Sequence, residues 1–406
     1  MPVPFQPHIP LNPCSASPGL ALNTKDEKVP AHVYPDGIRF CVGETVEGFK
    51  KEQLFFNPSN TDLNQLNIGV VGDLGTGKTQ LLKTLIYQIV RSSAQNRGMR
   101  PRFLILDYKK DYCSPDFVEA VNARVIKPQH LPVNVFDRSH SKDALTPWLD
   151  RFNFFSDVLD KIYSGIGPVQ RRQLKTAVKN AYDICGPDSQ PTVYNIQEAY
   201  AVLLGDKPDS PSAILDDIVD REIFHREPTK AGLLEDFLDG VVVLDLGSLG
   251  QDDRAKNMVV AIMLNVFYEQ MLRIPKRPFL GNNPQLRAVD SFLLVDEADN
   301  IMRYEFDVLR KILLQGREFG VGVILASQYL RHFKAGASDY REPLLTWFIH
   351  KVPNITSNEI QALGMSVESS LIAERIKVLQ KHWCLYKTAE VEGTIIHGVP
   401  FYTLFQ

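Results

Sequence analysis

One short stretch, GDLGTGKT at Gly72–Thr79, limits the folds open to this chain more than any other feature. It matches the pattern G-x-x-x-x-G-K-[ST], follows the apolar run at 66–71 and precedes a helical stretch at 78–91. Glycines let the backbone turn so that successive N–H groups point inward, and these groups bind phosphate oxygens together with the amino end of the next helix. A strand, this loop and a helix in that order predict a nucleotide-binding α/β domain.

The side chains of this loop have distinct roles in a nucleotide site. Lys78 would reach the β and γ phosphates of ATP, and the hydroxyl group of Thr79 would bind Mg²⁺. The other predicted nucleotide contacts follow the loop into the helix: Gly72, Asp73, Leu74, Gly75, Thr76, Gly77 and Gln80. A glycine-rich turn that matches the pattern by chance is the alternative, but the flanking strand and helix favour a phosphate-binding loop.

A second motif, FLLVDEAD at 292–299, supplies the acids that ATP hydrolysis requires. It is an apolar strand that ends in adjacent carboxylates. Asp296 would hold Mg²⁺ through water, and Glu297 would be the base that polarises the attacking water. Asp299 is better explained as the start of a helix than as a ligand. For the whole motif, the alternative is a strand that ends at an exposed acidic turn.

Apolar runs without alternation predict the fold class. They lie at 66–71, 102–107, 241–246, 291–296 and 321–327, each bounded by helical or turn sequence. Such runs suit strands that are covered on both faces, as in the parallel sheet of an α/β protein. We therefore expect an α/β fold with a mainly parallel sheet.

The remaining segments differ in pattern from this core. Residues 1–36 are rich in proline and predict an extended N-terminal arm, and residues 37–60 predict a short β hairpin. Residues 140–239 have amphipathic helical patterns and predict a helical insertion. The nucleotide-binding core would then consist of residues 61–139 and 240–406.

Composition excludes several classes of protein. The net charge is −3, with 44% hydrophobic and 23% charged residues, as in an ordinary globular protein. The five cysteines are scattered without a CxxC pair, which argues against a disulfide framework or a zinc site and fits a reducing cytoplasm. No apolar stretch is long enough to span a membrane, and the first residues lack a signal-peptide pattern. We expect a cytoplasmic protein that has no membrane partner.

Four stretches resemble the HerA/FtsK superfamily of P-loop ATPases, DNA-pumping motors that include conjugation coupling proteins. The stretches are GDLGTGKT, LILDYKKDY at 104–112, LLVDEADNI at 293–301 and LLQGREFGVGVILASQ at 313–328. The resemblance implies a P-loop NTPase fold of the additional-strand catalytic-glutamate (RecA-like) type, and hydrolysis of ATP with Mg²⁺. It assigns Arg317 to charge neutralisation during hydrolysis and Gln328 to sensing the nucleotide. By position alone, Gln328 is equally well explained as a solvated residue at a strand end.

The same resemblance implies partners. Motors of this superfamily are homo-oligomeric rings, here expected to be a hexamer, in which a basic residue of the neighbouring subunit completes each ATP site. Candidates for this residue are Arg317, Arg341, Lys351 and Arg375. Duplex DNA would bind basic segments that are otherwise ordinary solvated patches. These segments contain Lys109, Lys110, Arg171, Arg172, Lys175, Lys179, Lys276, Arg277, Arg331 and Lys334.

Motifs of two other nucleotide-binding classes, NKxD of GTPases and LSGGQ of ABC-type ATPases, are missing from the sequence. The stretches at 131–137, 167–182 and 348–364 resemble the ATPase part of phosphorothioation-dependent restriction proteins of the DptH type. We therefore hypothesise an oligomeric DNA translocase or remodelling motor in a bacterial DNA-processing or defence (restriction) system, with a partner nuclease making any cut. The alternative is a nucleotide-gated assembly platform that switches a partner nuclease without translocating.

Overall fold

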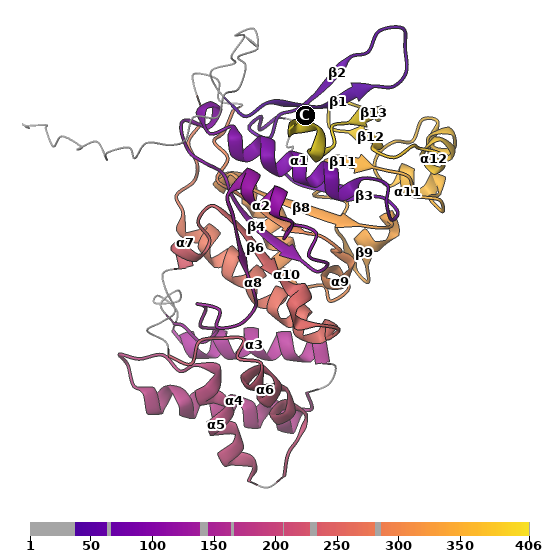
Figure 1. Ribbon diagram of the computed structural model, residues 1–406. Helices are drawn as coiled ribbons and strands as arrows, with labels where there is room; N and C mark the ends of the chain where they lie inside the picture. The colour runs from indigo at the N-terminus through magenta and orange to yellow at the C-terminus, as the bar shows by residue number, and fades with distance from the viewer. Residues whose placement is uncertain are drawn as a thin grey trace, which may run out of the picture. The chain divides into compact units, whose positions relative to one another are not determined.

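A computed structural model describes most of the chain. The described residues are 37–62, 66–138, 145–163, 166–205, 207–227, 234–280 and 286–405. The predicted arm at 1–36 lies outside them. Within the described residues, a sheet of eleven strands has the order β2-β1-β13-β12-β11-β3-β8-β7-β4-β6-β5 (Figure 1).

The larger part of this sheet is parallel. Its strands in spatial order are β11 (Thr346–Ile349), β3 (Ile68–Val71), β8 (Val321–Ser327), β7 (Ser291–Val295), β4 (Arg102–Asp107), β6 (Val241–Asp245) and β5 (Ala123–Ile126). Each neighbouring pair in this series is parallel. The expected α/β fold with a mainly parallel sheet is confirmed, and β3, β4, β6, β7 and β8 lie within the predicted apolar runs.

One side of the sheet is antiparallel. It consists of β12 (Trp383–Lys387), β13 (Thr394–Gly398), β1 (Phe40–Thr45) and β2 (Gln53–Phe56). Strand β12 pairs with β11 and with β13, and β13 pairs with β1. The hairpin of β1 and β2 therefore continues the main sheet.

Two hydrophobic cores lie on opposite faces of the sheet, and successive residues of β4 contribute to them in turn. Ile105 is buried in the core that contains α1 and α2, and its neighbour Leu104 is buried in the core that contains α8 and α10. This double burial explains why the central strands have no polar face. The covering helices are α1 (Lys78–Arg91), α2 (Pro115–Val121), α8 (Asp253–Arg273) and α10 (Asp307–Gln315).

A group of helices lies in the sequence between β5 and β6. They are α3 (Pro147–Tyr163), α4 (Pro168–Cys185), α5 (Val193–Leu204), α6 (Ser210–Asp220) and α7 (Leu234–Phe237). Helix α3 packs on α8 and links the group to the sheet (Figure 1). An ion pair of 2.5 Å joins Arg151 of α3 to Glu269 of α8 at this contact.

Short elements complete the described residues. They are the helices α9 (Asp299–Met302), α11 (Ser357–Gln361) and α12 (Ser369–Lys377), the strands β9 (Lys334–Ala335) and β10 (Ser338–Asp339), and the 3-10 turns η1 (Ala94–Asn96), η4 (Leu246–Leu249), η5 (Gly316–Phe319), η6 (Leu330–Phe333) and η7 (Phe401–Phe405). Among the helices described here, none combines the length and apolar character that crossing a membrane requires.

Candidate functional site

The carboxyl ends of four neighbouring parallel strands meet at one edge of the sheet. The phosphate-binding loop follows β3, Gln328 follows β8, the Asp296–Glu297 pair follows β7, and Lys109 follows β4. Loops at this edge of an open α/β sheet are where such proteins bind ligands. The strand order therefore brings these segments together although they are far apart in the sequence.

The loop between β3 and α1 has a backbone that only glycine adopts easily at two positions. Gly75 and Gly77 have φ values of 72° and 108°, in the left-handed region, and α1 begins directly after Gly77, at Lys78. The ammonium group of Lys78 donates to the carbonyl oxygens of Gly72 and Asp73. Burial lowers the pKa of Lys78, while the nearby Asp296 raises it. The lysine thus lies folded over the loop, where a phosphate would compete for it.

Asp296 is buried at the end of β7. The hydroxyl group of Tyr112 donates to its Oδ2 atom over 3.1 Å. Burial, followed by the charge of Glu297, raises the pKa of Asp296 to about 6. Asp296 and Thr79 line one cavity. A carboxylate and a hydroxyl group facing a phosphate-binding loop fit Mg²⁺, which is usually held by one or two carboxylates together with substrate phosphates and water.

Glu297 contacts two side chains that come from the ends of two other strands. Its Oε1 atom forms an ion pair with the ammonium group of Lys109, and its Oε2 atom lies 3.5 Å from Nε2 of Gln328. The backbone of Glu297 has a left-handed φ of 57°, a conformation in which a non-glycine residue is uncommon. The predicted base and sensor are therefore neighbours, and Lys109, predicted only as a DNA contact, holds the carboxylate.

The turn that presents Lys109 is organised by the carboxylate at the end of β4. Asp107 accepts hydrogen bonds from the backbone N–H groups of Lys109 (3.2 Å), Asp111 (3.1 Å) and Tyr112 (2.9 Å). Burial raises its pKa, and these bonds oppose that effect. One acidic side chain thus positions both the lysine on Glu297 and the tyrosine on Asp296.

Arg317 lies away from this group. It belongs to η5, which precedes β8, and its guanidinium group donates to the carbonyl oxygen of Thr61 over 2.6 Å. Gln328 follows the other end of β8, so the strand separates the two residues by roughly 20 Å at 3.3 Å per residue. Arg317 therefore does not reach the site of its own chain.

The other basic residues predicted for a neighbouring site are placed differently. Arg341 pairs with Asp339, and Arg375 pairs with Glu47. The carbonyl oxygen of Lys351 accepts a hydrogen bond of 2.8 Å from the N–H of Asp73, so this residue flanks the loop within its own chain.

A cavity of about 370 Å³ opens over the loop. Its lining consists of Asp73, Leu74, Gly75, Thr76, Gly77, Lys78, Thr79, Gln80, Lys109, Asp111, Asp296, Glu297, Lys381 and His382. Gly72, the first residue of the motif, is not part of this lining. A Cβ atom added to Gly72 would come within 2.6 Å of the side chain of His350. Lys381 and His382 were not predicted, because the sequence around them carries no recognisable motif.

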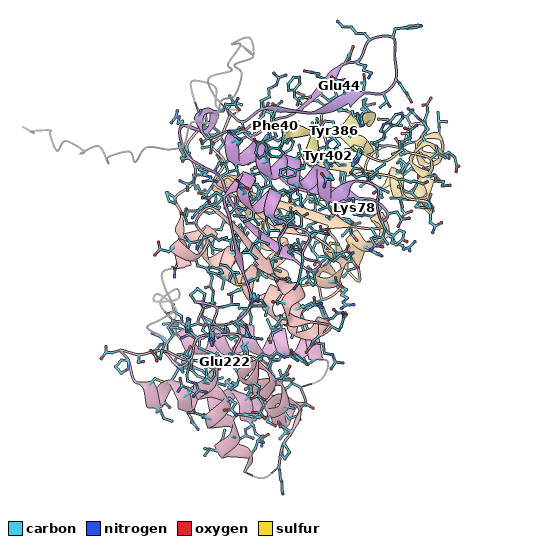
Figure 2. All side chains as sticks on the ribbon, in the orientation of Figure 1. Phe40, Glu44, Lys78, Glu222, Tyr386 and Tyr402 are labelled. Atoms are coloured by element: carbon cyan, nitrogen blue, oxygen red, sulfur yellow. The ribbon has the colours of Figure 1, made fainter. Side chains whose placement is uncertain are left out.

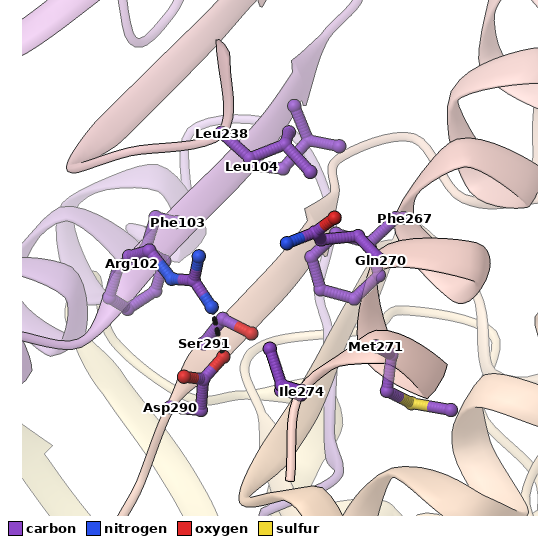
Figure 3. Close-up of a pocket in the computed structure, with 10 residues that line it drawn as sticks. All are labelled: Arg102, Phe103, Leu104, Leu238, Phe267, Gln270, Met271, Ile274, Asp290 and Ser291. Atoms are coloured by element: carbon purple, nitrogen blue, oxygen red, sulfur yellow. Dashed lines mark hydrogen bonds and ion pairs between the residues drawn. The ribbon is translucent and has the colours of Figure 1, made fainter. Parts of the chain in front are cut away.

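A second cavity lies at the opposite, amino end of the strands. Arg102, which begins β4, and Asp290, which precedes β7, form an ion pair of 2.6 Å there (Figure 3). Arg277 also pairs with Asp290. This cavity measures about 10 Å³, roughly the volume that one water molecule needs. It has no room for a nucleotide, whereas the cavity over the loop does.

Comparisons with known proteins place this fold. No protein-family model and no curated protein matches the sequence. The structure is similar to that of VirB4 of Thermoanaerobacter pseudethanolicus, with a TM-score of 0.70 and 15% identity over 91% of this chain and 98% of the other. It is also similar to the bacterial conjugative coupling protein TrwB, with a TM-score of 0.53 and 13% identity over 84% of this chain and 86% of the other.

A structure of the plasmid coupling protein TrwB in complex with ADP and Mg²⁺ has a TM-score of 0.51 and 14% identity, over 81% of this chain and 84% of the other. These likenesses confirm the expected P-loop NTPase fold.

Proposed function

We propose that this chain is a Mg²⁺-dependent ATPase. The observation that carries the proposal is that Lys78, Asp296 and Glu297 line one cavity at the carboxyl edge of the sheet, with Gln328 in contact with Glu297. Lys78 and the loop N–H groups bind the triphosphate, and Thr79 and Asp296 hold Mg²⁺. Glu297 orients and polarises the attacking water, and Gln328 beside it responds to the presence of the γ-phosphate. TrwB, which has a similar fold, is described with ADP and Mg²⁺ bound, and this supports the choice of nucleotide and metal.

We further propose that hydrolysis drives movement along duplex DNA, in a homo-oligomeric ring in the cytoplasm that serves DNA processing or defence together with a partner nuclease. The fold shared with a coupling protein supports this role. Arg331 and Lys334 are exposed in and after η6, shortly after Gln328, so DNA phosphates bound there would be close to the sensor. In contrast, Arg277 is bound to Asp290, which makes it a poor DNA contact.

The ion pair of Lys109 and Glu297 fits both the motor and the alternative function, the nucleotide-gated switch. While Lys109 holds the carboxylate, Glu297 is a weaker base for water, so hydrolysis awaits an event that moves the lysine. That event is DNA binding in a motor and partner binding in a switch. Lys109→Met should therefore raise turnover in the absence of both.

The test of the proposed function is the rate of ATP turnover with Mg²⁺, measured with and without duplex DNA of increasing length. We expect Glu297→Gln to lower the rate by roughly 10² to 10⁴. Glu318→Gln, at an exposed ion pair with Lys276, is the matched control and should keep the parent rate. Turnover by Glu297→Gln at the parent rate would disprove the assigned base.

Stimulation that grows with DNA length would support the motor. Stimulation by a partner protein alone would support the switch.

A further inference from the structure

The sheet order gives the nucleotide cavity two distinct ends. Strand β7, which precedes Glu297, lies two positions from β3 on one side, and β12, which follows His382, lies two positions from β3 on the other. Neighbouring strands are about 4.8 Å apart, so β7 and β12 are roughly 19 Å apart across the loop. Glu297 and Asp296 mark the γ-phosphate end. A nucleoside on the side of the loop away from these acids would lie toward β12, where Lys381 and His382 line the cavity.

His382 is held rigidly at this second end. Because β12 runs antiparallel to β11, its first residue lies at the carboxyl edge of the parallel strands. The N–H of His382 donates to the carbonyl oxygen of Thr76 over 2.9 Å, and its own carbonyl oxygen accepts from Gly398 over 2.9 Å. An added Cβ atom at Gly77 would lie 2.6 Å from Nδ1 of His382. The imidazole ring therefore packs directly on the phosphate-binding loop.

Tyr402 extends this surface. It belongs to η7, which packs on α1 (Figure 2). Its N–H donates to Oε1 of Gln80 over 3.3 Å. Its ring centre lies 5.8 Å from that of His382, and its hydroxyl group lies 3.5 Å from Nε2 of that ring. Tyr402 remains 48% exposed. Two partly exposed rings therefore lie side by side here, with His382 against Gly77 and Tyr402 against Gln80.

We propose that the pair of rings formed by His382 and Tyr402, inclined at 68° to each other, binds the base of the nucleotide, with one ring stacked on the face of the base and the other at its edge. This inference rests on the proposed ATPase function. Burial, with Lys381 and His397 nearby, lowers the pKa of His382. An imidazole and a phenol ring both offer aromatic surface to a base. Aromatic stacking of this kind tolerates different bases because every base has a π-face. Recognition is therefore of a nucleoside triphosphate, with the base held mainly through its face.

The test separates the base from the phosphates. Binding of Mg–ATP and of Mg–tripolyphosphate, which has no base, is measured by calorimetry for the parent and for His382→Asn and Tyr402→Ala. Asn tolerates the left-handed backbone of His382, where φ is 67°, so the substitution removes the ring and keeps the turn. His130→Asn is the matched control, since His130 is exposed and has a left-handed φ of 50°.

We expect each variant to bind ATP roughly tenfold more weakly and tripolyphosphate as tightly as the parent does, and the control to match the parent for both ligands. The stacking role is overturned if ATP affinity is unchanged, or if both ligands weaken equally. If the parent binds neither ligand, the proposed ATPase function fails and the base site fails with it. If the parent binds both ligands but the variants do not bind ATP selectively more weakly, the proposed base site is wrong and the proposed ATPase function stands.

Discussion

His350 shows how closely the nucleotide loop depends on single buried side chains. It follows β11, its N–H donates to the carbonyl oxygen of Val71 over 2.7 Å, and its side chain lies against Gly72. Burial, with the charge of Lys78 nearby, lowers the pKa of His350 to about 3. The folded chain therefore keeps this ring neutral throughout the pH range in which an exposed histidine takes up a proton.

A pH dependence of stability follows from this shift. An unfolded histidine has a pKa of about 6.5, so below that pH the unfolded state binds a proton that the folded state excludes. The free energy of unfolding should therefore decrease as the pH is lowered, and His350 should account for a decrease of about 2 kcal/mol between pH 6.5 and pH 5. We expect the free energy of urea unfolding to decrease less between pH 7 and pH 5 for His350→Leu than for the parent. Equal losses in the two proteins would contradict the prediction.

Some residues of the candidate site could be identified from the sequence, and others could not. Lys78 and Asp296 lie in motifs whose spacing is set by direct contact with one ligand, so both could be named in advance. Their predicted roles are still to be tested. Lys109 lies in the stretch LILDYKKDY, but it was predicted only as a DNA contact, and His382 occupies a turn without a motif. Both reach the cavity only because β4 and β12 lie on the two sides of β3. Sheet order depends on long-range pairing, which no local pattern encodes.

At the scale of elements, β3 depends on a close approach to β11. Gly69 is opposite Trp347 in the parallel pair, and a Cβ atom added to Gly69 would lie 2.3 Å from the indole ring. The indole N–H donates to the carbonyl oxygen of Leu344 over 2.7 Å, and the ring is fully buried. The tryptophan therefore cannot yield without losing a hydrogen bond and its packing.

Gly69→Ala should consequently destabilise the fold, by about 1 to 3 kcal/mol, the usual cost of overpacking a core. The measurement is the midpoint of urea unfolding. Gly167→Ala is the matched control, because an added Cβ atom there meets only Gln170, at 3.4 Å, with an ordinary backbone φ of −62°. Equal stability of the two variants would mean that Trp347 moves freely.

The apolar runs predicted five central strands, β3, β4, β6, β7 and β8, that are buried on both faces, but they missed β11, whose four residues are also buried. β4 and β8 appear as unbroken apolar runs, and their bounds match the runs. β5 was missed, because it is a short edge strand with Arg124 and Val125 exposed. β12 and β13 were missed because both are short antiparallel strands in which some residues are not buried. Partial exposure removes the hydrophobic signal on which such predictions rest.

For the whole molecule, the question is how the helices α3 to α6 are joined to the nucleotide-binding sheet. Helix α3 packs on α8, which lies in the core on the face opposite α1. These helices therefore contact the core away from the phosphate-binding loop. At this contact, Arg151 and Glu269 are both largely buried, and burial raises the pKa of Glu269 while Arg151 lowers it.

Removing only the cation should therefore cost more than removing both charges. Arg151→Met takes the guanidinium group from a carboxylate that is largely excluded from water, and we expect a loss of about 3 to 5 kcal/mol in the free energy of urea unfolding. The double variant Arg151→Met with Glu269→Met removes the buried charge as well and should recover most of that loss. Because both proteins lack Arg151, their difference isolates the cost of burying the Glu269 carboxylate without that guanidinium group, while Asn265 still donates to it. A double variant no more stable than Arg151→Met would show that the loss comes from the contacts of the Arg151 side chain itself and not from the buried carboxylate left behind.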